Sequence, residues 1–324
     1  MRTFGIVILL FVSVFVLIKS ADLTLEALKS LTRKLHAKAF VVSAIILAIA
    51  TSLPELFVGI TSALEGSSNL SLGNILGANI ANLSLVVGLS AMVSGGVFIH
   101  EKIVSKEILL AAGAGALPIF LFLDGTLSRV DGIILLAVYL AYATSFFKVR
   151  FLEIGKHHLR GRYFLRFVRH LEEVEQKADK TLGHLFVGIA ALLFSANFIV
   201  KIAREFAEVS GIPIFVVGVV LLSLGTTLPE VVVSMESLKK GQPGVFFGNI
   251  LGSLIVNSTL ILGIVAVISP VRDGDLKNYL TTLIAFVIIF FLFWLFTRTK
   301  LRLERWEAGV LLAIYIVFVV VEFL

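Results

Sequence analysis

The chain contains one stretch twice: ATSLPE at 50–55 followed by GNILGANIAN at 73–82, and GTTLPE at 225–230 followed by GNILGSLIVN at 248–257. Glu55 and Glu230 are 175 positions apart, and the same offset relates the prolines, glycines and asparagines of the two copies without a gap. Each copy places a proline and a carboxylate inside a long apolar segment. An ionisable group there costs about 2.5 kcal/mol or more and marks a functional site by default. Two such placements in register indicate a duplicated site.

The composition places this site in a membrane. Hydrophobic residues make up 58% of the chain and charged residues 15%, whereas soluble domains are about 45–50% apolar and about 25% charged. The apolar runs are long enough to cross about 30 Å of hydrocarbon as helices, and they lack the alternation of a membrane barrel. We therefore predict an all-α integral membrane protein. The absence of cysteine excludes disulfides and thiolate metal sites.

The hydropathy pattern predicts ten transmembrane helices, at about 4–18, 39–64, 70–95, 105–123, 129–147, 182–200, 212–237, 245–268, 278–297 and 306–323. They form a first five-helix unit over 1–147 and a second over 182–324, joined by the polar segment 148–181. That segment carries nine Lys and Arg residues. Under the positive-inside rule it is cytoplasmic.

The remaining basic residues test this orientation. Loops assigned to the inside, the central one included, hold 22 Lys and Arg residues, and those assigned to the outside hold six. The bias predicts a multi-pass protein of the cell membrane with both termini outside. We attribute the basic excess to orientation in the lipid bilayer, and we expect no nucleic-acid partner.

Three segments allow alternatives. The first span could be a secretory signal peptide, but it has only Arg2 before it and a counterpart in span six, where IVKIAREF resembles LIKSADL. Residues 21–37 are too charged to span and predict an amphipathic helix on the cytoplasmic face. Residues 163–175 could bind anionic lipid in the same way or form a solvated helical linker.

The repeat offset contains five spans, which is an odd number, so the second unit is predicted to sit upside down relative to the first. Inverted-topology repeats are typical of secondary transporters, whose site lies at the membrane midplane where the repeats meet. The prolines predict the same place. Pro54 and Pro229 lack an amide hydrogen, which frees carbonyl oxygens near Ala50 and Gly225. Such backbone is tolerated at membrane depth only where it lines a cavity or finds another partner.

The candidate ligands around those carbonyls are all hard oxygens. They are the carboxylates, hydroxyls and amides of Glu55, Glu230, Thr51, Ser52, Thr226, Thr227, Asn74, Asn82, Asn249 and Asn257, together with the backbone at Ala50 and Gly225. This set suits Ca²⁺ or Na⁺ and does not suit zinc or copper. The GxxxG spacings at Gly73/Gly77 and Gly248/Gly252 predict close helix packing that brings the asparagines toward the glutamates.

The paired LPE and GNxxG segments resemble the two α-repeats of the sodium/calcium exchangers, of the compact prokaryotic type, over nearly the whole chain. The resemblance implies that Glu55 and Glu230 are the central Ca²⁺ and Na⁺ ligands. It also implies hydroxyl and carbonyl ligands at Thr51, Ser52, Thr226 and Thr227, and polar ligands at Asn82 and Asn257.

The sequence departs from the family pattern at several positions. Ala50 stands where glycine is usual, and Ala78 stands where many members carry the serine that the second repeat keeps as Ser253. The resemblance therefore implies one inner Na⁺ site with a hydroxyl and one without. Asn257 stands where some members have aspartate, which leaves two central carboxylates and argues against a K⁺ requirement.

These observations favour an antiporter that exchanges Na⁺ for Ca²⁺ by alternating access. Two alternatives remain: H⁺/Ca²⁺ exchange, in which the glutamates take protons, and a cation channel lined by the same oxygens. We expect no enzymatic activity, because the midplane lacks Ser–His, His-rich or paired-aspartate groups. We also expect no cofactor beyond the transported ions, and the sequence indicates no obligatory protein partner.

Overall fold

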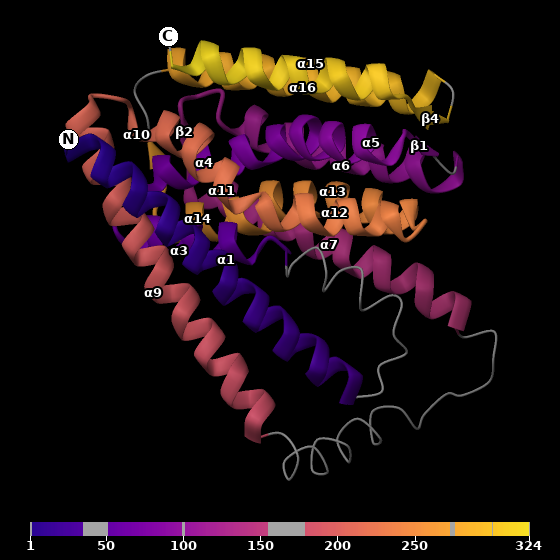
Figure 1. The fold of residues 1–324 in the computed structure, drawn as a ribbon, viewed down its shortest axis with the longest axis horizontal. Helices are drawn as coiled ribbons and strands as arrows, with labels where there is room; N and C mark the ends of the chain where they lie inside the picture. Colours follow the sequence, from indigo (N-terminus) through magenta and orange to yellow (C-terminus); the bar gives the residue numbers. More distant parts are fainter. Residues whose placement is uncertain are drawn as a thin grey trace.

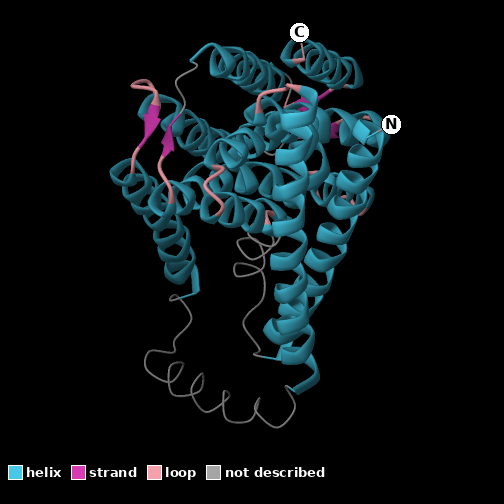
Figure 2. Ribbon diagram, turned by 90° about the vertical axis from the view of Figure 1, so that its left-hand side faces the viewer, coloured by secondary structure: helices cyan, strands magenta, loops and turns pink. Residues whose placement is uncertain are grey.

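The computed structural model describes residues 2–34, 51–98, 101–154, 179–272, 276–299 and 301–323. This part of the chain is nearly all helical (Figures 1 and 2). The first half contains α1 (Arg2–Lys34), α3 (Leu53–Leu64), α4 (Ser68–Ala81), η1 (Asn82–Val86), α5 (Val87–Ser94), α6 (Glu101–Leu121) and α7 (Arg129–Ile154). The second half contains α9 (Asp179–Ser210), α10 (Ile214–Val216), η2 (Val217–Leu222), α11 (Ser223–Thr226), α12 (Leu228–Lys239), α13 (Pro243–Ile255), η3 (Val256–Ile261), α14 (Leu262–Ile268), α15 (Leu276–Thr299) and α16 (Arg305–Glu322).

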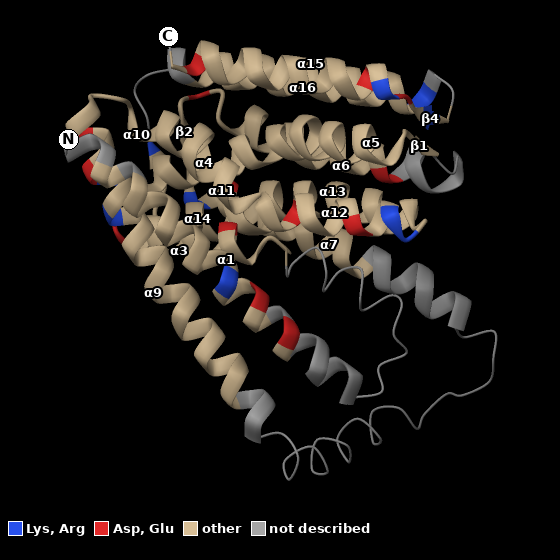
Figure 3. Ribbon diagram, in the orientation of Figure 1, with Lys and Arg blue, Asp and Glu red and all other residues tan. Residues whose placement is uncertain are grey.

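Many of these helices present apolar side chains outward as well as inward. Among the described residues, five helical segments are long and apolar enough to cross a membrane: Ser68–Ser94, Gly183–Ser210, Ile214–Lys239, Pro243–Ile268 and Tyr279–Arg298. Charged residues are sparse along the helices and most of the ribbon is uncharged (Figure 3). The all-helical membrane class is therefore confirmed. The ten-span layout stays a prediction, because the span expected at 39–64 is described only from residue 51.

The long helices α1 and α9 lie side by side at one edge of the molecule (Figure 1). Ile6, Leu10, Val14 and Leu17 recur every three or four residues of α1, so they share one face and are buried in a cluster with α9. Phe11 lies on the opposite face with 61% of its surface exposed. An apolar residue so exposed suits lipid contact.

Two helices extend beyond the predicted spans. We expected the first span to end near residue 18 with a separate amphipathic helix after it, but α1 is one helix from Arg2 to Lys34. Residues 19–34 contain no proline or glycine to stop it. The helix α9 likewise continues to Ser210, ten residues beyond the predicted end, because Ala203 and Phe206 still pack in the α1–α9 cluster. Residues 163–175 lie outside the described residues.

Within the described residues, four short strands that the sequence did not predict connect the two halves. Strand β1 (Val97–Phe98) pairs antiparallel with β4 (Arg302–Leu303), and β2 (Thr126–Leu127) pairs antiparallel with β3 (Val271–Arg272). Figure 2 shows these pairs in magenta. A shift of 175 residues carries β1 to within one residue of β3, and β2 to within one residue of β4. Each pair therefore joins the first half to the second in equivalent fashion.

Candidate cation site

The second copy of the repeated stretch interrupts a helix, and the described part of the first copy has the matching backbone geometry. In the second copy α11 ends at Thr226 and α12 begins at Leu228, while in the first copy Ser52 precedes α3. Ser52 has φ −85° and ψ 11°, and its counterpart Thr227 has φ −83° and ψ −1°. This bridge region of backbone space is sparsely populated and frequent at functional sites. The interruption predicted from the prolines is thus present in the second copy, and Ser52 has the equivalent backbone conformation in the first.

The two carboxylates follow directly after the interruption and are wholly buried. Glu55 and Glu230 each have 0% of their surface exposed. None of their four oxygens makes a hydrogen bond of ordinary geometry to the described residues. They lie close enough to interact with each other, and each also faces a threonine of the opposite copy, Thr226 for Glu55 and Thr51 for Glu230. Burying two charges without partners is costly, so this pair of carboxylates is the candidate centre of a cation site.

The threonines bond across the repeat. Thr51 Oγ1 donates to Asn249 Oδ1 at 3.1 Å, and Thr226 Oγ1 donates to Asn74 Oδ1 at 3.2 Å. A shift of 175 residues converts the first bond into the second. All four side chains are buried. In this structure Asn74 and Asn249 hold the threonine hydroxyls, and their own role as cation ligands stays a prediction.

The remaining hydroxyls differ between the copies. Ser253 Oγ lies 3.3 Å from Thr51 Oγ1. The equivalent residue of the first copy is Ala78, which has no hydroxyl to place beside Thr226. Thr227 donates to the carbonyl of Ser223 in its own helix at 2.7 Å. Ser52 Oγ is buried and has no hydrogen-bond partner among the described residues. The site is therefore symmetric in its carboxylates and asymmetric in its hydroxyls.

The amides of Asn82 and Asn257 lie at the two π-helical turns. Asn82 begins η1 and Asn257 is the second residue of η3, and both are fully buried. Such wide turns occur frequently at functional sites. The turn η1 contacts α12, the helix of Glu230, and η3 contacts α3, the helix of Glu55. Both amide oxygens are without a hydrogen-bond partner in the described structure. The turns that carry the amides therefore contact the helices that carry the carboxylates, and contact between the side chains themselves stays a prediction.

Close helix packing makes this convergence possible. A Cβ on Gly73 would lie 2.2 Å from the carbonyl oxygen of Phe215, and one on Gly77 would lie 2.1 Å from that of Val219. The first GxxxG spacing is therefore a packing motif, as predicted, whereas the prediction is wrong for Gly248 of the second, where no described atom lies within 4 Å of an added Cβ. Gly225 is also a contact residue, because a Cβ there would lie 2.5 Å from Val14 of α1. Ala50 lies outside the described residues.

Comparison with known proteins decides the family. The profile described as sodium/calcium exchanger protein matches residues 5–148 and 180–324. The chain belongs to the sodium/calcium exchanger family. Its relatives are transporters and not enzymes, in agreement with the prediction from the sequence.

Individual relatives of this exchanger cover almost its full length. Sodium/calcium exchanger MaX1 of Methanosarcina acetivorans is 29% identical over 353 residues, covering 100% of this chain and 99% of the relative. Inner membrane protein YrbG of Escherichia coli is 28% identical and covers 88% of each chain. The solved sodium-calcium exchanger NCX_Mj superposes with a TM-score of 0.62 at 24% identity, covering 99% of this chain and 98% of that one. The fold is therefore that of a compact prokaryotic exchanger.

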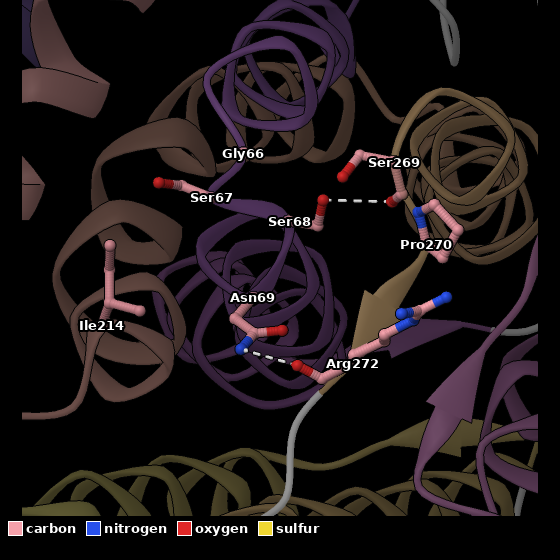
Figure 4. Close-up of a pocket in the computed structure, with 8 residues that line it drawn as sticks. All are labelled: Gly66, Ser67, Ser68, Asn69, Ile214, Ser269, Pro270 and Arg272. Atoms are coloured by element: carbon pink, nitrogen blue, oxygen red, sulfur yellow. Dashed lines mark hydrogen bonds between the residues drawn. The ribbon is translucent and has the colours of Figure 1, made fainter.

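A separate pocket of about 300 Å³ lies in the loops of this exchanger. Its lining includes Ser68, which donates to the carbonyl of Ser269 at 3.0 Å, and Asn69, which donates to that of Arg272 at 3.4 Å (Figure 4). None of the predicted ligands lines this pocket, and an arginine does. It is therefore distinct from the buried cation site.

Sequence reasoning missed three polar residues of the buried region. Asn79 and Ser258 bond to each other, and Ser234 accepts a hydrogen bond from Asn249 Nδ2 at 3.4 Å. In the first copy Gly59 occupies the position equivalent to Ser234. Asn79 lies one helical turn before Asn82, inside the quoted motif, and this spacing could have identified it. The two serines carry no comparable signal.

Proposed function

We propose that this exchanger is a secondary active antiporter that moves Ca²⁺ in exchange for Na⁺ by alternating access to one site at the membrane midplane. The observation that carries the proposal is the pair of wholly buried carboxylates, Glu55 and Glu230, whose oxygens make no hydrogen bond of ordinary geometry to the described residues. Their surroundings are hydroxyl and amide oxygens, the ligands that Ca²⁺ and Na⁺ accept. No third His, Cys, Asp or Glu joins them within the described residues.

Charge balance supplies the coupling. Two carboxylates neutralise one Ca²⁺, and an empty site leaves two negative charges in a medium of low dielectric constant. The empty carrier therefore reorients poorly, while a carrier loaded with Ca²⁺ or with Na⁺ ions reorients readily. Because the two loads share the same oxygens, occupancy is mutually exclusive and transport becomes exchange. The name and family of MaX1, a sodium/calcium exchanger, support these ions as substrates.

Alternating access in this proposal uses the ten-helix, inverted-repeat architecture. The 175-residue symmetry of the Thr–Asn bonds and of the strand pairs supports two equivalent halves. The helices α1 and α9 pack mainly on each other, so we assign them as the unit that moves over the rest. Both termini lie outside in this arrangement, and 148–181 lies in the cytoplasm.

The test is ⁴⁵Ca²⁺ uptake into proteoliposomes loaded with Na⁺, with K⁺ or with a proton gradient. Sodium-loaded vesicles should accumulate Ca²⁺, and vesicles without Na⁺ should not. Uptake driven by an outward H⁺ gradient alone, with no effect of Na⁺, would replace this function by H⁺/Ca²⁺ exchange. Passage of Ca²⁺ down its gradient without any counter-ion would instead identify a channel.

A further inference from the structure

Two consecutive hydrogen bonds link Asn257, one of the two buried amides, to Asn79 and Ser258. Asn257 Nδ2 donates to Asn79 Oδ1 at 3.3 Å, and Asn79 Nδ2 donates to Ser258 Oγ at 2.8 Å. Asn79 belongs to α4, while Asn257 and Ser258 belong to η3. All three side chains are at most 1% exposed. These hydrogen bonds therefore connect the amide of Asn257, in the second half of the protein, to Asn79 in the first half.

The direction of these bonds decides which end of Asn257 remains available. A carboxamide has one oxygen that a cation attracts and one NH₂ group that a cation repels. The NH₂ group of Asn257 is occupied by Asn79 Oδ1, and the oxygen has no hydrogen-bond partner in the described residues. A reversed chain would present the NH₂ group instead. Asn79 thus holds Asn257 with its oxygen free for a ligand.

Asn82, the equivalent amide of the first half, lacks the residues that would form such hydrogen bonds. The positions that correspond to Asn79 and Ser258 under the 175-residue shift are Leu254 and Leu83, neither of which has a polar side-chain atom. Correspondingly, neither Oδ1 nor Nδ2 of Asn82 has a hydrogen-bond partner in the described structure. The two amides are therefore not interchangeable, although their positions in the repeat are equivalent.

We propose that Asn79 is a positioning residue for cation binding, which orients the Asn257 oxygen toward the transported Ca²⁺ and makes Asn257 the pre-oriented amide of the pair. The proposal rests on the proposed function, since it takes Asn257 as a ligand. Hydrogen-bond partners that orient metal ligands typically account for about 10–100-fold in metal affinity. This neutral, oriented amide supplies an oxygen without adding a third negative charge.

The first measurement is the Ca²⁺ concentration for half-maximal uptake into Na⁺-loaded vesicles, with Ca²⁺ binding to the detergent-solubilised protein measured by calorimetry. Asn79→Leu, which copies Leu254, should raise both values by about tenfold or more. Ser258→Ala removes only the far acceptor and should give a smaller increase. Thr259→Val is the matched control. The Thr259 hydroxyl is buried and bonds to the carbonyl of Ile255 in its own helix at 2.6 Å, so its loss should leave affinity unchanged.

A double-mutant cycle separates orientation from a general structural effect. Both oxygens of a carboxylate are equivalent, so Asn257→Asp needs no orienting partner. Adding Asn79→Leu to Asn257→Asp should therefore change Ca²⁺ affinity by less than about threefold, since coupled residues show non-additive effects. An equal loss of affinity in both backgrounds would overturn the proposal. If Asn79→Leu does not yield folded protein, Ser258→Ala in the two backgrounds gives the same comparison.

One further variant distinguishes failure of this inference from failure of the proposed site. Asn257→Leu should itself lower Ca²⁺ affinity. If Asn257→Leu has no effect, Asn257 is not a ligand and the site assignment fails, and the role of Asn79 fails with it. If Asn257→Leu lowers affinity but Asn79→Leu does not, only the positioning role is refuted. If both lower affinity and the cycle is non-additive, the inference holds.

Discussion

The oxygen atoms around Glu55 and Glu230 have different partners, and these partners define their roles. Thr51 and Thr226 each donate to an asparagine of the opposite copy, and each also faces a glutamate of the opposite copy. The carboxylates have no such donors within ordinary hydrogen-bond geometry. The free energy of Ca²⁺ binding at the proposed site should therefore depend first on the charge of the glutamates and second on the hydroxyls.

Removal of that charge is the most direct test. Glu55→Gln and Glu230→Gln each keep the side-chain shape but leave one negative charge against Ca²⁺. We expect either variant to abolish ⁴⁵Ca²⁺ uptake while the protein still inserts and elutes as a folded species on size-exclusion chromatography. Thr259→Val serves as a control for the loss of a buried polar group. Near-normal transport in either glutamine variant would refute the site.

Selectivity should depend on the neutral charge of Asn257. With only two carboxylates at the centre, Ca²⁺ uptake should be driven by internal Na⁺ and be indifferent to K⁺. Asn257→Asp adds a buried carboxylate, so it should change the response to Na⁺ and K⁺ without abolishing transport. Uptake by wild-type vesicles under matched Na⁺ with and without K⁺ is the measurement. A K⁺ requirement in the wild type would contradict the assignment.

At the scale of single residues, the sequence predicted those that repeat and missed those that do not. Glu55, Glu230 and the threonines stand in register, so duplication identified them. Asn79 bonds to a residue 178 positions away, and its counterpart is Leu254. Hydrogen bonds of this kind depend on tertiary packing, which a single sequence with no repeat signal does not reveal.

Among the elements, α9 is tied to the loop between α3 and α4. Arg204 donates to the carbonyl of Glu65 at 2.7 Å and to Ser67 Oγ at 2.5 Å, and Asn197 donates to Glu65 Oε1 at 3.2 Å. Proposed movement of the α1–α9 pair over α3 would break these bonds. They therefore tie α9 to the C-terminal end of α3, the helix that carries Glu55 in its first turn.

Loss of this connection should affect turnover more than affinity. Arg204→Ala should change the maximal rate of Ca²⁺ uptake about two- to tenfold, which corresponds to a change of about 0.5–1.5 kcal/mol in the barrier when these part-buried bonds are lost. The half-saturating Ca²⁺ concentration should stay within about twofold. Lys201→Ala, an exposed lysine on the same helix, is the matched control. Identical kinetics for both variants would show that the Arg204 contacts do not limit the movement.

The contact between α4 and η2 should be intolerant of any side chain at Gly77. Even a single methyl group there meets the backbone oxygen of Val219, and overpacking of this kind costs about 1–3 kcal/mol. Gly77→Ala should lower the thermal stability of the detergent-solubilised protein by several degrees. Gly113→Ala in α6, where no described atom lies within 4 Å of the added Cβ, should not. Equal stability of the two variants would mean that α4 can shift away from η2.

Helix boundaries were the weakest part of the sequence prediction, and the reason lies in the helices themselves. Hydropathy marks where a helix leaves the bilayer, but α1 and α9 continue beyond it because they stabilise each other along an apolar face. Hydropathy also treats Ser68–Ser94 as one uniform span, whereas the structure divides it at the wide turn η1. Neither packing partners nor turn geometry are encoded in average hydrophobicity.

For the whole molecule, orientation in the membrane can be tested with single cysteines, because the chain has none of its own. A cysteine introduced within 155–160 should react with an impermeant maleimide only from the cytoplasmic side, as the 22 to 6 distribution of basic residues predicts. A cysteine at Ser67 or Ser68 should react only from outside. Labelling of both positions from the same side would rule out the ten-span, inverted arrangement.

The crossed Thr–Asn bonds also bear on how the protein is made. Thr51 requires Asn249, and Asn74 accepts from Thr226, so each half emerges from the ribosome without the partners of its buried polar groups. At roughly 5–20 residues per second, the second copy follows the first by roughly 10–35 s. During that interval the first half holds Glu55 and unpaired amides in or near the bilayer. Until the second copy is synthesised, the buried polar groups of the first half therefore lack the hydrogen-bond partners that they have in the finished fold.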